Sequence, residues 1–221
     1  MTEVLKFDEK THRYTLSGKP LAGVTTVISN IPEELALSSA FMRKAALGTE
    51  VHTICERINQ GMRVSFKDVD PEIKSYVDGW KKFLADFEVK PLLCECCVYH
   101  DLYGYAGTLD LFAFVGGHPV ILDIKTVSCM SRTPALQTAA YNEALHHLWK
   151  KKKIDTIKPT GDRMVVQLLP DGGYKLYYYS RFTQSFHFEV FKSKLLCLNW
   201  DNGLYVNGVE ELPRKYKRKS E

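Results

Sequence analysis

The chain has 221 residues, of which 45% are hydrophobic and 25% charged, as in a folded globular protein with one good core and hardly two domains. Its formal net charge of +4 permits a polyanionic partner without requiring one. Charges run through residues 1–10 and no apolar run approaches a membrane span, so we expect an intracellular protein with no signal peptide and no membrane contact. Its six cysteines are then expected to be free thiols in a reducing compartment.

Residues 1–31 predict a small β-meander that caps the core. Val4–Phe7, Arg13–Leu16 and Leu21–Ile28 are short, apolar and β-prone runs. Ser17–Pro20 contains the Gly and Pro that favour a turn, which separates the second run from the third.

Helical periodicity follows the meander. Glu33–Ala46 and Gly48–Asn59 place apolar residues at spacings of three and four, and Gly61 suits a C-terminal stop. His52 and Glu56 are four residues apart, so their side chains share one helix face. For this pair alone, a hydrogen bond at the helix surface is the simplest interpretation.

A brief strand and a further helix complete a helical layer over residues 32–88. Val64–Phe66 reads as the strand. Asp70 is a good helix cap and Pro71 suits a first turn, so a helix is expected over Glu72–Phe87. Its apolar residues form one inward stripe that covers the sheet: Ile73, Val77, Trp80, Phe83, Leu84 and Phe87.

Leu92–His100 predicts the first strand of the core. Cys94, Cys96 and Cys97 lie on it and point to alternate faces, so we interpret all six cysteines as buried or incidental thiols. Glu95 interrupts these cysteines, and a cross-strand ion pair is the simplest role for it.

Two apolar, β-prone runs, Thr108–Val115 and Val120–Thr126, predict a hairpin closed at Gly116-Gly117. With this two-residue loop, Val115 pairs with His118. Counting back from that pair places Asp110 opposite Asp123, and Lys125 on the same face as Asp123.

Two facing carboxylates repel each other, and burying them among apolar neighbours costs still more. A divalent cation that prefers oxygen ligands, such as Mg²⁺, relieves both problems. Lys125 beside this ion can stabilise a nucleophile or a phosphate oxygen, so the hairpin predicts metal-assisted attack on a phosphodiester. A surface Asp–Lys pair on an ordinary hairpin is the alternative.

The chain after the hairpin predicts a helix from Thr133 to Trp149, on which Gln137 and Tyr141 are four residues apart. Lys150–Lys153 complements the dipole at the end of this helix, and a phosphate-tracking patch is a secondary interpretation.

Arg163–Leu169 and Tyr174–Ser180 predict a second hairpin, and Thr183–Trp200 predicts a closing helix. The basic tail, residues 204–221, is either a DNA arm that ignores sequence or a solubilising end.

Four motifs in order resemble one known family. Asp110 followed by Asp123-Ile124-Lys125 resembles the PD-(D/E)XK nuclease signature, in the branch of RecB-type nuclease domains and phage exonucleases such as that of lambda. Gly48-x-x-x-His52-x-x-x-Glu56 resembles the first motif of this branch, and Gln137-x-x-x-Tyr141 its Q-x-x-x-Y motif. The stretch from Phe7 to Ile28 is similar to the N-terminal region of many phage-encoded members, where we expect it to pack or to hold DNA rather than to do chemistry.

The resemblance implies the fold. It implies an α/β, restriction-endonuclease-like core with a central mixed sheet flanked by helices, preceded by the meander and the helical layer. We expect a single nuclease domain over 1–221, with the core at 89–203 and the tail at 204–221.

The resemblance also implies a site. Asp110, Asp123 and Lys125 are the implied catalytic residues, and His52, the two aspartates and the Ile124 carbonyl are the implied ligands of one or two Mg²⁺ or Mn²⁺ ions. The implied supporting or DNA-groove residues are Glu56, Glu95, Gln137 and Tyr141, and the candidate backbone contacts are Lys151, Lys152, Arg214 and Lys215. Some relatives hold an iron–sulfur cluster with three cysteines near the C-terminus. Here only Cys197 lies there, so no cluster is expected.

The implied function is that of a Mg²⁺- or Mn²⁺-dependent DNA exonuclease in recombination, repair or replication. A phage genome is one origin that the resemblance implies. The ion lowers the pKa of a bound water, Lys125 orients this water, and phosphodiester hydrolysis follows. Two alternatives stay open: an endonuclease of the same fold that cuts flap or branched DNA, and a non-catalytic DNA-binding or assembly protein.

The implied partner is single- or double-stranded DNA of any sequence, together with a helicase, an annealing protein or further copies of the chain. Cytoplasm of a bacterium or a phage-infected host is the expected location, with the mitochondrion and the nucleus left open.

Overall fold

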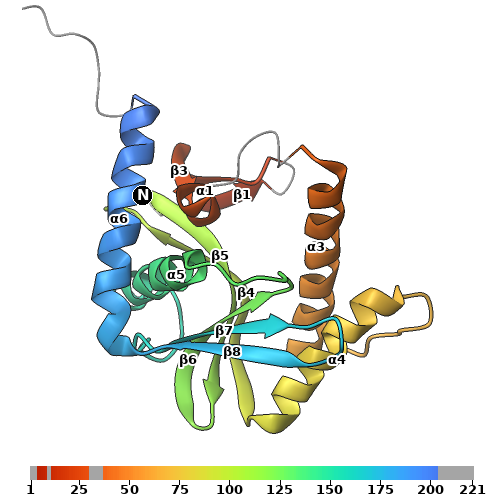
Figure 1. Cartoon of the computed structure of the whole chain (residues 1–221). Coiled ribbons are helices and arrows are strands. Elements are labelled where there is room, and N and C mark those ends of the chain that lie inside the picture. Colours follow the sequence, from red (N-terminus) through yellow and green to blue (C-terminus); the bar gives the residue numbers. More distant parts are fainter. Residues whose placement is uncertain (1–3, 9–10, 30–36, 204–221) are drawn as a thin grey trace, which may run out of the picture.

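The computed structural model describes residues 4–8, 11–29 and 37–203, so the first residues of the expected helix at 33–46 and the basic tail with Arg214 and Lys215 lie outside the described residues. Within them, an eight-stranded mixed sheet is flanked by helices on both faces, which confirms the expected α/β class (Figure 1). The strands are β1 Leu5–Asp8, β2 Arg13–Leu16, β3 Lys19–Gly23, β4 Val89–His100, β5 Tyr105–Val115, β6 His118–Lys125, β7 Arg163–Leu168 and β8 Tyr174–Tyr179. The helices are α1 Val24–Ile28, α3 Ser39–Asn59, α4 Pro71–Asp86, α5 Thr133–Lys150, α6 Gln184–Asp201 and the 3₁₀ turn η1 Arg181–Thr183.

Strand β5 is the centre of the sheet, and its two edges differ. One edge pairs antiparallel with β4 from Tyr105 to Val115. On the other edge, β3 pairs in parallel at Tyr105 and Ala106, while β6 pairs antiparallel from Leu111 to Val115. The sheet therefore forks, and residues 107–110 of β5 have no ladder partner on this edge.

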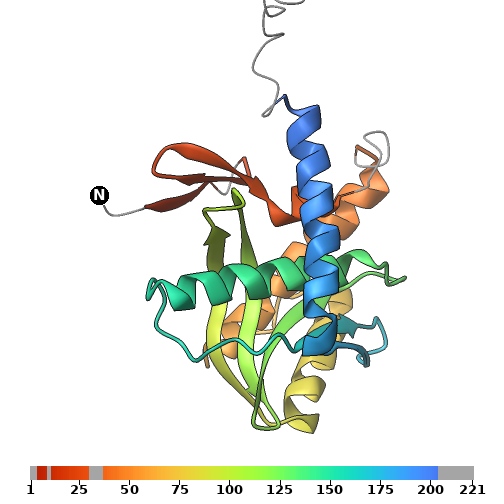
Figure 2. The same cartoon turned by 90° about the vertical axis from the view of Figure 1, so that its left-hand side faces the viewer.

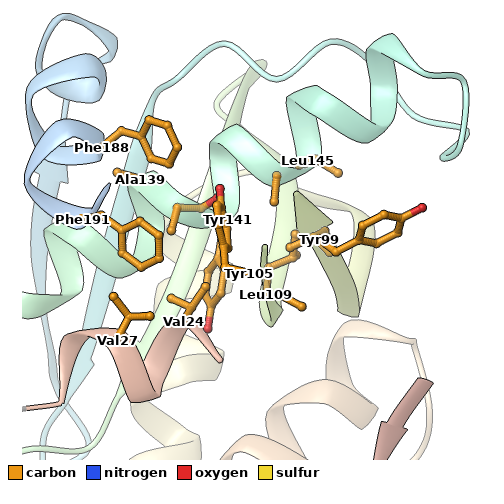
Figure 3. Packing of buried hydrophobic residues seen from close by; sticks show 14 of the residues in the cluster. Val24, Val27, Tyr99, Tyr105, Leu109, Ala139, Tyr141, Leu145, Phe188 and Phe191 are labelled. Carbon is orange, nitrogen blue, oxygen red and sulfur yellow. The ribbon is translucent and has the colours of Figure 1, made fainter. Parts of the chain in front are cut away.

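Two hydrophobic clusters lie on opposite faces of the sheet. Helices α1, α5 and α6 pack on one face, where α5 and α6 meet β5 around Tyr105 and Leu109 (Figures 2 and 3). Helices α3 and α4 pack on the other face, against Leu111, Leu122 and Val166. No helix in the described part of the chain is long and apolar enough to cross a bilayer.

The local signals in the sequence place most elements correctly. Val115 pairs with His118, as the two-residue loop predicts. Asp70 accepts a hydrogen bond from the Glu72 amide at 2.8 Å and so caps α4, and Gly61 follows α3 with a φ of 72°. The hairpin of β7 and β8 also forms, and most of the observed ends lie within one or two residues of the expected ones.

The expected strand Leu21–Ile28 is wrong in its second half, because Val24–Ile28 is the helix α1. Val24, Val27 and Ile28 are buried at the spacing of one helical face, in the cluster that includes α5 and α6. Packing on one side therefore overrides the strand propensity of β-branched residues.

The expected break between two helices near Leu47 is also wrong, since α3 is one continuous helix through Gly48. A Cβ at Gly48 would lie 3.3 Å from Thr126 Oγ1, so glycine here permits close packing against the end of β6 instead of ending a helix.

Two smaller expectations also differ. The brief strand expected at Val64–Phe66 is loop, in which the Phe66 ring lies 3.8 Å from the Lys81 ammonium. The closing helix begins with η1, so α6 itself starts at Gln184. All six cysteines are free, with Cys55 buried and Cys129 and Cys197 exposed.

Candidate functional site

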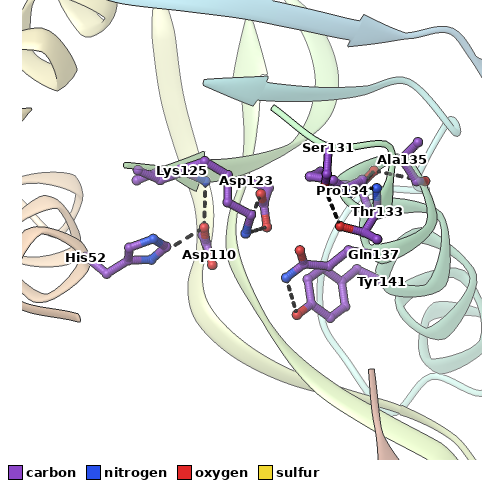
Figure 4. A network of polar contacts seen from close by, with 12 residues as sticks. His52, Asp110, Asp123, Lys125, Ser131, Thr133, Pro134, Ala135, Gln137 and Tyr141 are labelled. Atoms are coloured by element: carbon purple, nitrogen blue, oxygen red, sulfur yellow. Dashed lines mark hydrogen bonds and ion pairs between the residues drawn. The ribbon is translucent and has the colours of Figure 1, made fainter. Parts of the chain in front are cut away.

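The fork in the sheet brings the candidate residues together. Asp110 is the last residue of the unpaired edge of β5, and the β5–β6 ladder ends next to it at Leu111 and Leu122. Its carboxylate reaches across the gap, where Oδ2 accepts a hydrogen bond from the Ile124 amide at 2.7 Å (Figure 4). This bond replaces the missing ladder contact and fixes the carboxylate at the mouth of the fork.

His52 reaches the same carboxylate from α3. Its Nδ1 lies 3.5 Å from Asp110 Oδ2 (Figure 4). Glu56, one turn further along α3, instead accepts a hydrogen bond from Gln60. The simple interpretation of a His52–Glu56 hydrogen bond is therefore not what the structure has, and the helix turns His52 toward the sheet.

Glu95 of β4 joins His52 and Asp110 to form a group of three. Cys94 and Cys96 pair with Leu111 and Leu109, which puts Glu95 opposite Asp110. Its φ is 42°, in the left-handed region that a non-glycine residue seldom adopts and that often marks functional sites.

His52, Glu95 and Asp110 each offer a ligand atom within 4.8 Å of the other two. Burial raises the pKa of Glu95 to about 8, with further contributions from Asp110 and Glu56. Two carboxylates that repel each other beside an imidazole are a donor set that fits a divalent cation, because a cation removes this repulsion.

Asp123 and Lys125 form an ion pair next to this group. Lys125 Nζ lies 3.0 Å and 2.8 Å from the two Asp123 oxygens, so the two residues share a face as expected (Figure 4). Burial raises the pKa of Asp123, with Asp110 adding to it, despite Lys125. Burial opposes the charge on Lys125, but Asp123 and Asp110 outweigh it and raise the pKa of this ammonium. Lys125 therefore stays cationic near neutral pH.

Gln137 and Tyr141 cover the fork from α5. Both are buried, and Gln137 Nε2 donates a hydrogen bond to the Tyr141 hydroxyl at 3.0 Å (Figure 4). A Cβ at Gly107 would lie 2.6 Å from Tyr141 Cε1, so only glycine on this part of β5 leaves room for the ring.

Two cavities meet at this site. One, of about 310 Å³, is lined by residues of β1, β2, β5 and α5 as well as Asp110 and Lys125. The other, of about 350 Å³, runs along α3 past Glu56. His52 and Glu95 line both cavities, so the two cavities adjoin at these two residues.

A second group that offers metal-ligating atoms lies at the far end of β4, where His100 and Asp101 meet His147 of α5. Asp101 is already held there, by a short contact to His147 and by Lys151 at 2.5 Å. Lys151 and Lys152 follow the end of α5. At the rise of an α-helix, about 1.5 Å per residue, they lie about 20 Å along the helix axis from Gln137. These two candidate backbone contacts are thus separate from the fork.

The comparisons with known proteins give no assignment. No protein-family model and no curated protein matches the chain. One solved structure, the crystal structure of LHK-Exo in complex with dAMP, aligns with a TM-score of 0.28 and 13% identity, covering 84% of this chain and 95% of that one. Similarity at this level is too low to argue from, so the family resemblance stays a prediction based on the chain's own motifs.

The position of Glu95 is the part of the site that the sequence leaves open. The sequence predicts a supporting or DNA-groove residue, and the structure places its carboxylate with His52 and Asp110, while Asp123 is outside this group of three. The available signal was a glutamate between cysteines on a core strand. Its position opposite Asp110 depends on the β4–β5 register, which the sequence alone does not fix.

Proposed function

We propose that this protein is a metal-dependent deoxyribonuclease with a PD-(D/E)XK-type core, and that it acts as an exonuclease. The observation that supports this most is the group of His52, Glu95 and Asp110 beside the Asp123–Lys125 pair, at the mouth of a fork in the sheet. The order of these residues along the chain is the order of the family's motifs.

The chain's own residues have separate tasks in this proposal. His52, Glu95 and Asp110 hold a Mg²⁺ or Mn²⁺ ion, with Asp123 and the Ile124 carbonyl as further ligands. When bound, such an ion lowers the pKa of water and neutralises phosphate charge. The Ile124 amide keeps Asp110 oriented, as partners of ligating carboxylates do.

Lys125 acts as a cation rather than as a base. Its raised pKa disfavours proton abstraction, while its position favours contact with a nonbridging phosphate oxygen or the attacking water. Gln137 lines the same cavity from α5, where its amide donates to the Tyr141 hydroxyl. In the hydrolysis, the attacking water loses a proton to solvent, its oxygen forms a bond to phosphorus and the bond from phosphorus to the 3′-oxygen breaks. The 3′-oxygen then takes up a proton from solvent.

The experiment is digestion of end-labelled linear DNA, single- and double-stranded, beside a closed circle, in Mg²⁺, Mn²⁺ or EDTA. Asp123→Ala and Lys125→Ala test the site, and Asp101→Asn is the matched control from the second group. Metal-dependent loss of linear DNA alone, absent only in the site variants, supports the exonuclease. Cutting of the circle would replace it with an endonuclease, and no cleavage with either metal would overturn the enzyme.

A further inference from the structure

We infer that Phe7 and His12 stack against an unpaired nucleobase of the strand whose phosphate lies at Asp110, an inference that rests on the proposed function. The substrate at the site is then single-stranded DNA, or a duplex end that opens to present unpaired bases. Stacking uses the π-face that every base has, so it selects unpaired strands without selecting sequence.

The aromatic side chains come from the hairpin of β1 and β2. The Phe7 ring stacks on Tyr14, with centroids 4.6 Å apart and planes 23° from parallel. His12 meets Phe7 edge-on at 5.1 Å. Tyr14 is buried, and its hydroxyl is hydrogen-bonded to Thr108 Oγ1 at 2.9 Å. Because Thr108 lies two residues before Asp110 on β5, the rings have a fixed position relative to the candidate metal ligands.

The rings and the candidate chemistry line one cavity. Phe7 and His12 are on its walls together with Asp110, Lys125 and Gln137. Its volume of about 310 Å³ is at the lower end of the range for small-ligand sites, about 300–1,000 Å³. A phosphate at Asp110 and Lys125 therefore leaves the attached nucleoside facing the aromatic side of the cavity.

His12 also borders a larger groove. This groove, of about 950 Å³, lies between β2 and β3 on one side and the end of α6 on the other, where Asn199 and Asn202 line it. His12 is exposed and has a φ of 53°, a conformation that few non-glycine residues adopt. Core packing accounts for Tyr14, but it does not account for an exposed ring held in this conformation between two hollows. A strand that enters through the groove crosses His12 before it reaches the fork.

The test uses the full chain and single-stranded oligonucleotides whose terminal nucleotide, at one end or the other, is normal, abasic or 2-aminopurine. For wild type, we expect the abasic end to lower kcat/KM about tenfold, which is within what base–aromatic stacking gives. His12→Ala should cause a similar loss, mainly through KM, and should cleave normal and abasic ends equally. Phe186→Leu, at an exposed aromatic of α6, is the matched control and should behave as wild type.

A second readout separates this inference from the proposed function. In EDTA, wild type should quench terminal 2-aminopurine fluorescence, and His12→Ala should not. Phe7→Leu should follow His12→Ala, with thermal unfolding as a check because Phe7 is half-buried. Cleavage that ignores both the terminal base and His12 would overturn the stacking inference and leave the nuclease in place. Absence of cleavage would overturn the nuclease, and the quenching would still decide the stacking.

Discussion

Two groups of histidine and carboxylate lie along β4, one at Glu95 within the strand and one at its C-terminal end, and their charges are balanced in opposite ways. At the fork, Glu95 and Asp110 lie together, and burial with this repulsion raises the pKa of Glu95 to about 8. At the far end of β4, burial opposes the charge on Asp101, but the hydrogen bonds from Lys151 and His147 outweigh it and hold its pKa below the ordinary value.

The difference shows what distinguishes a candidate metal site from a cluster of the same residue types. Asp101 is neutralised by side chains of the protein itself. The carboxylates at the fork have His52 and Lys125 nearby, yet burial, with repulsion from Asp110 added to it, still raises the pKa of Glu95. A bound cation therefore relieves the repulsion between the carboxylates at the fork, but it adds little stabilisation at Asp101, whose charge is already paired.

The largest expected effect separates the two groups by activity. Asp110→Asn should lower cleavage by about 10³-fold or more, because it removes the charge of a proposed metal ligand, while the side-chain oxygen that remains can still accept from the Ile124 amide. Asp101→Asn should leave the rate within about twofold. Initial rates on labelled linear DNA at saturating Mn²⁺ measure both, and equal losses in the two variants would remove the distinction between the groups.

Lys125→Ala should lower kcat by about 10²-fold, since it removes one preorganised cation from the site. Because Lys125 acts as a cation, the remaining activity should keep the pH profile of wild type. The rate is measured from pH 6 to pH 9, with Asp101→Asn as the control. Loss of one limb of the pH profile would instead make Lys125 a base.

The two groups should also give opposite pH dependence of stability in the metal-free protein. Glu95 has a folded pKa of about 8, above the ordinary value of 4.5, so the folded state binds more protons in this window. Its stabilising contribution is present below pH 4.5 and is lost as pH rises through 8. Relative to Glu95→Gln, wild type should lose about 2–3 kcal/mol of unfolding free energy over this range.

Asp101 should do the reverse, because its folded pKa is below the ordinary 3.8. Its contribution is present above pH 3.8 and is lost as pH falls through the folded pKa. Urea titrations of wild type, Glu95→Gln and Asp101→Asn, carried out at pH values from below 3.8 to above 8, measure both trends. A Glu95→Gln curve parallel to wild type would show that neither burial nor the neighbouring carboxylates raise the pKa of Glu95.

Gly107→Ala should destabilise the protein by about 1–2 kcal/mol, because the added methyl overlaps the Tyr141 ring at 2.6 Å. Gly48→Ala meets only the Thr126 hydroxyl, at 3.3 Å, and gains helix propensity that offsets the contact. Thermal unfolding of the two variants gives the comparison. A destabilisation at Gly48 as large as at Gly107 would mean that the packing of Tyr141 on Gly107 is no tighter than the packing of Thr126 on Gly48.

The sequence predicts those features whose causes are local. The two-residue loop sets the register between Val115 and His118, and the alternation of side chains along a strand puts Asp123 and Lys125 on one face. Asp70 and Pro71 likewise locate the start of α4 from their own chemistry.

The features that it does not predict depend on distant partners. Val24–Ile28 has strand propensity, and contact with α5 and α6 makes it helical. The fork arises because β3 and β6 pair with different parts of one edge of β5, and no local pattern encodes this. The contact of Glu95 with Asp110 and His52 depends in addition on a left-handed residue that a strand pattern does not anticipate.

Binding of Mn²⁺, followed by electron paramagnetic resonance of the free ion, tests the central claim most directly. Wild type and Asp101→Asn should bind the ion alike, and Asp110→Asn should lose the tight site. Tight binding that survives Asp110→Asn and disappears in Asp101→Asn would contradict the account, because it would move the metal to the far end of β4.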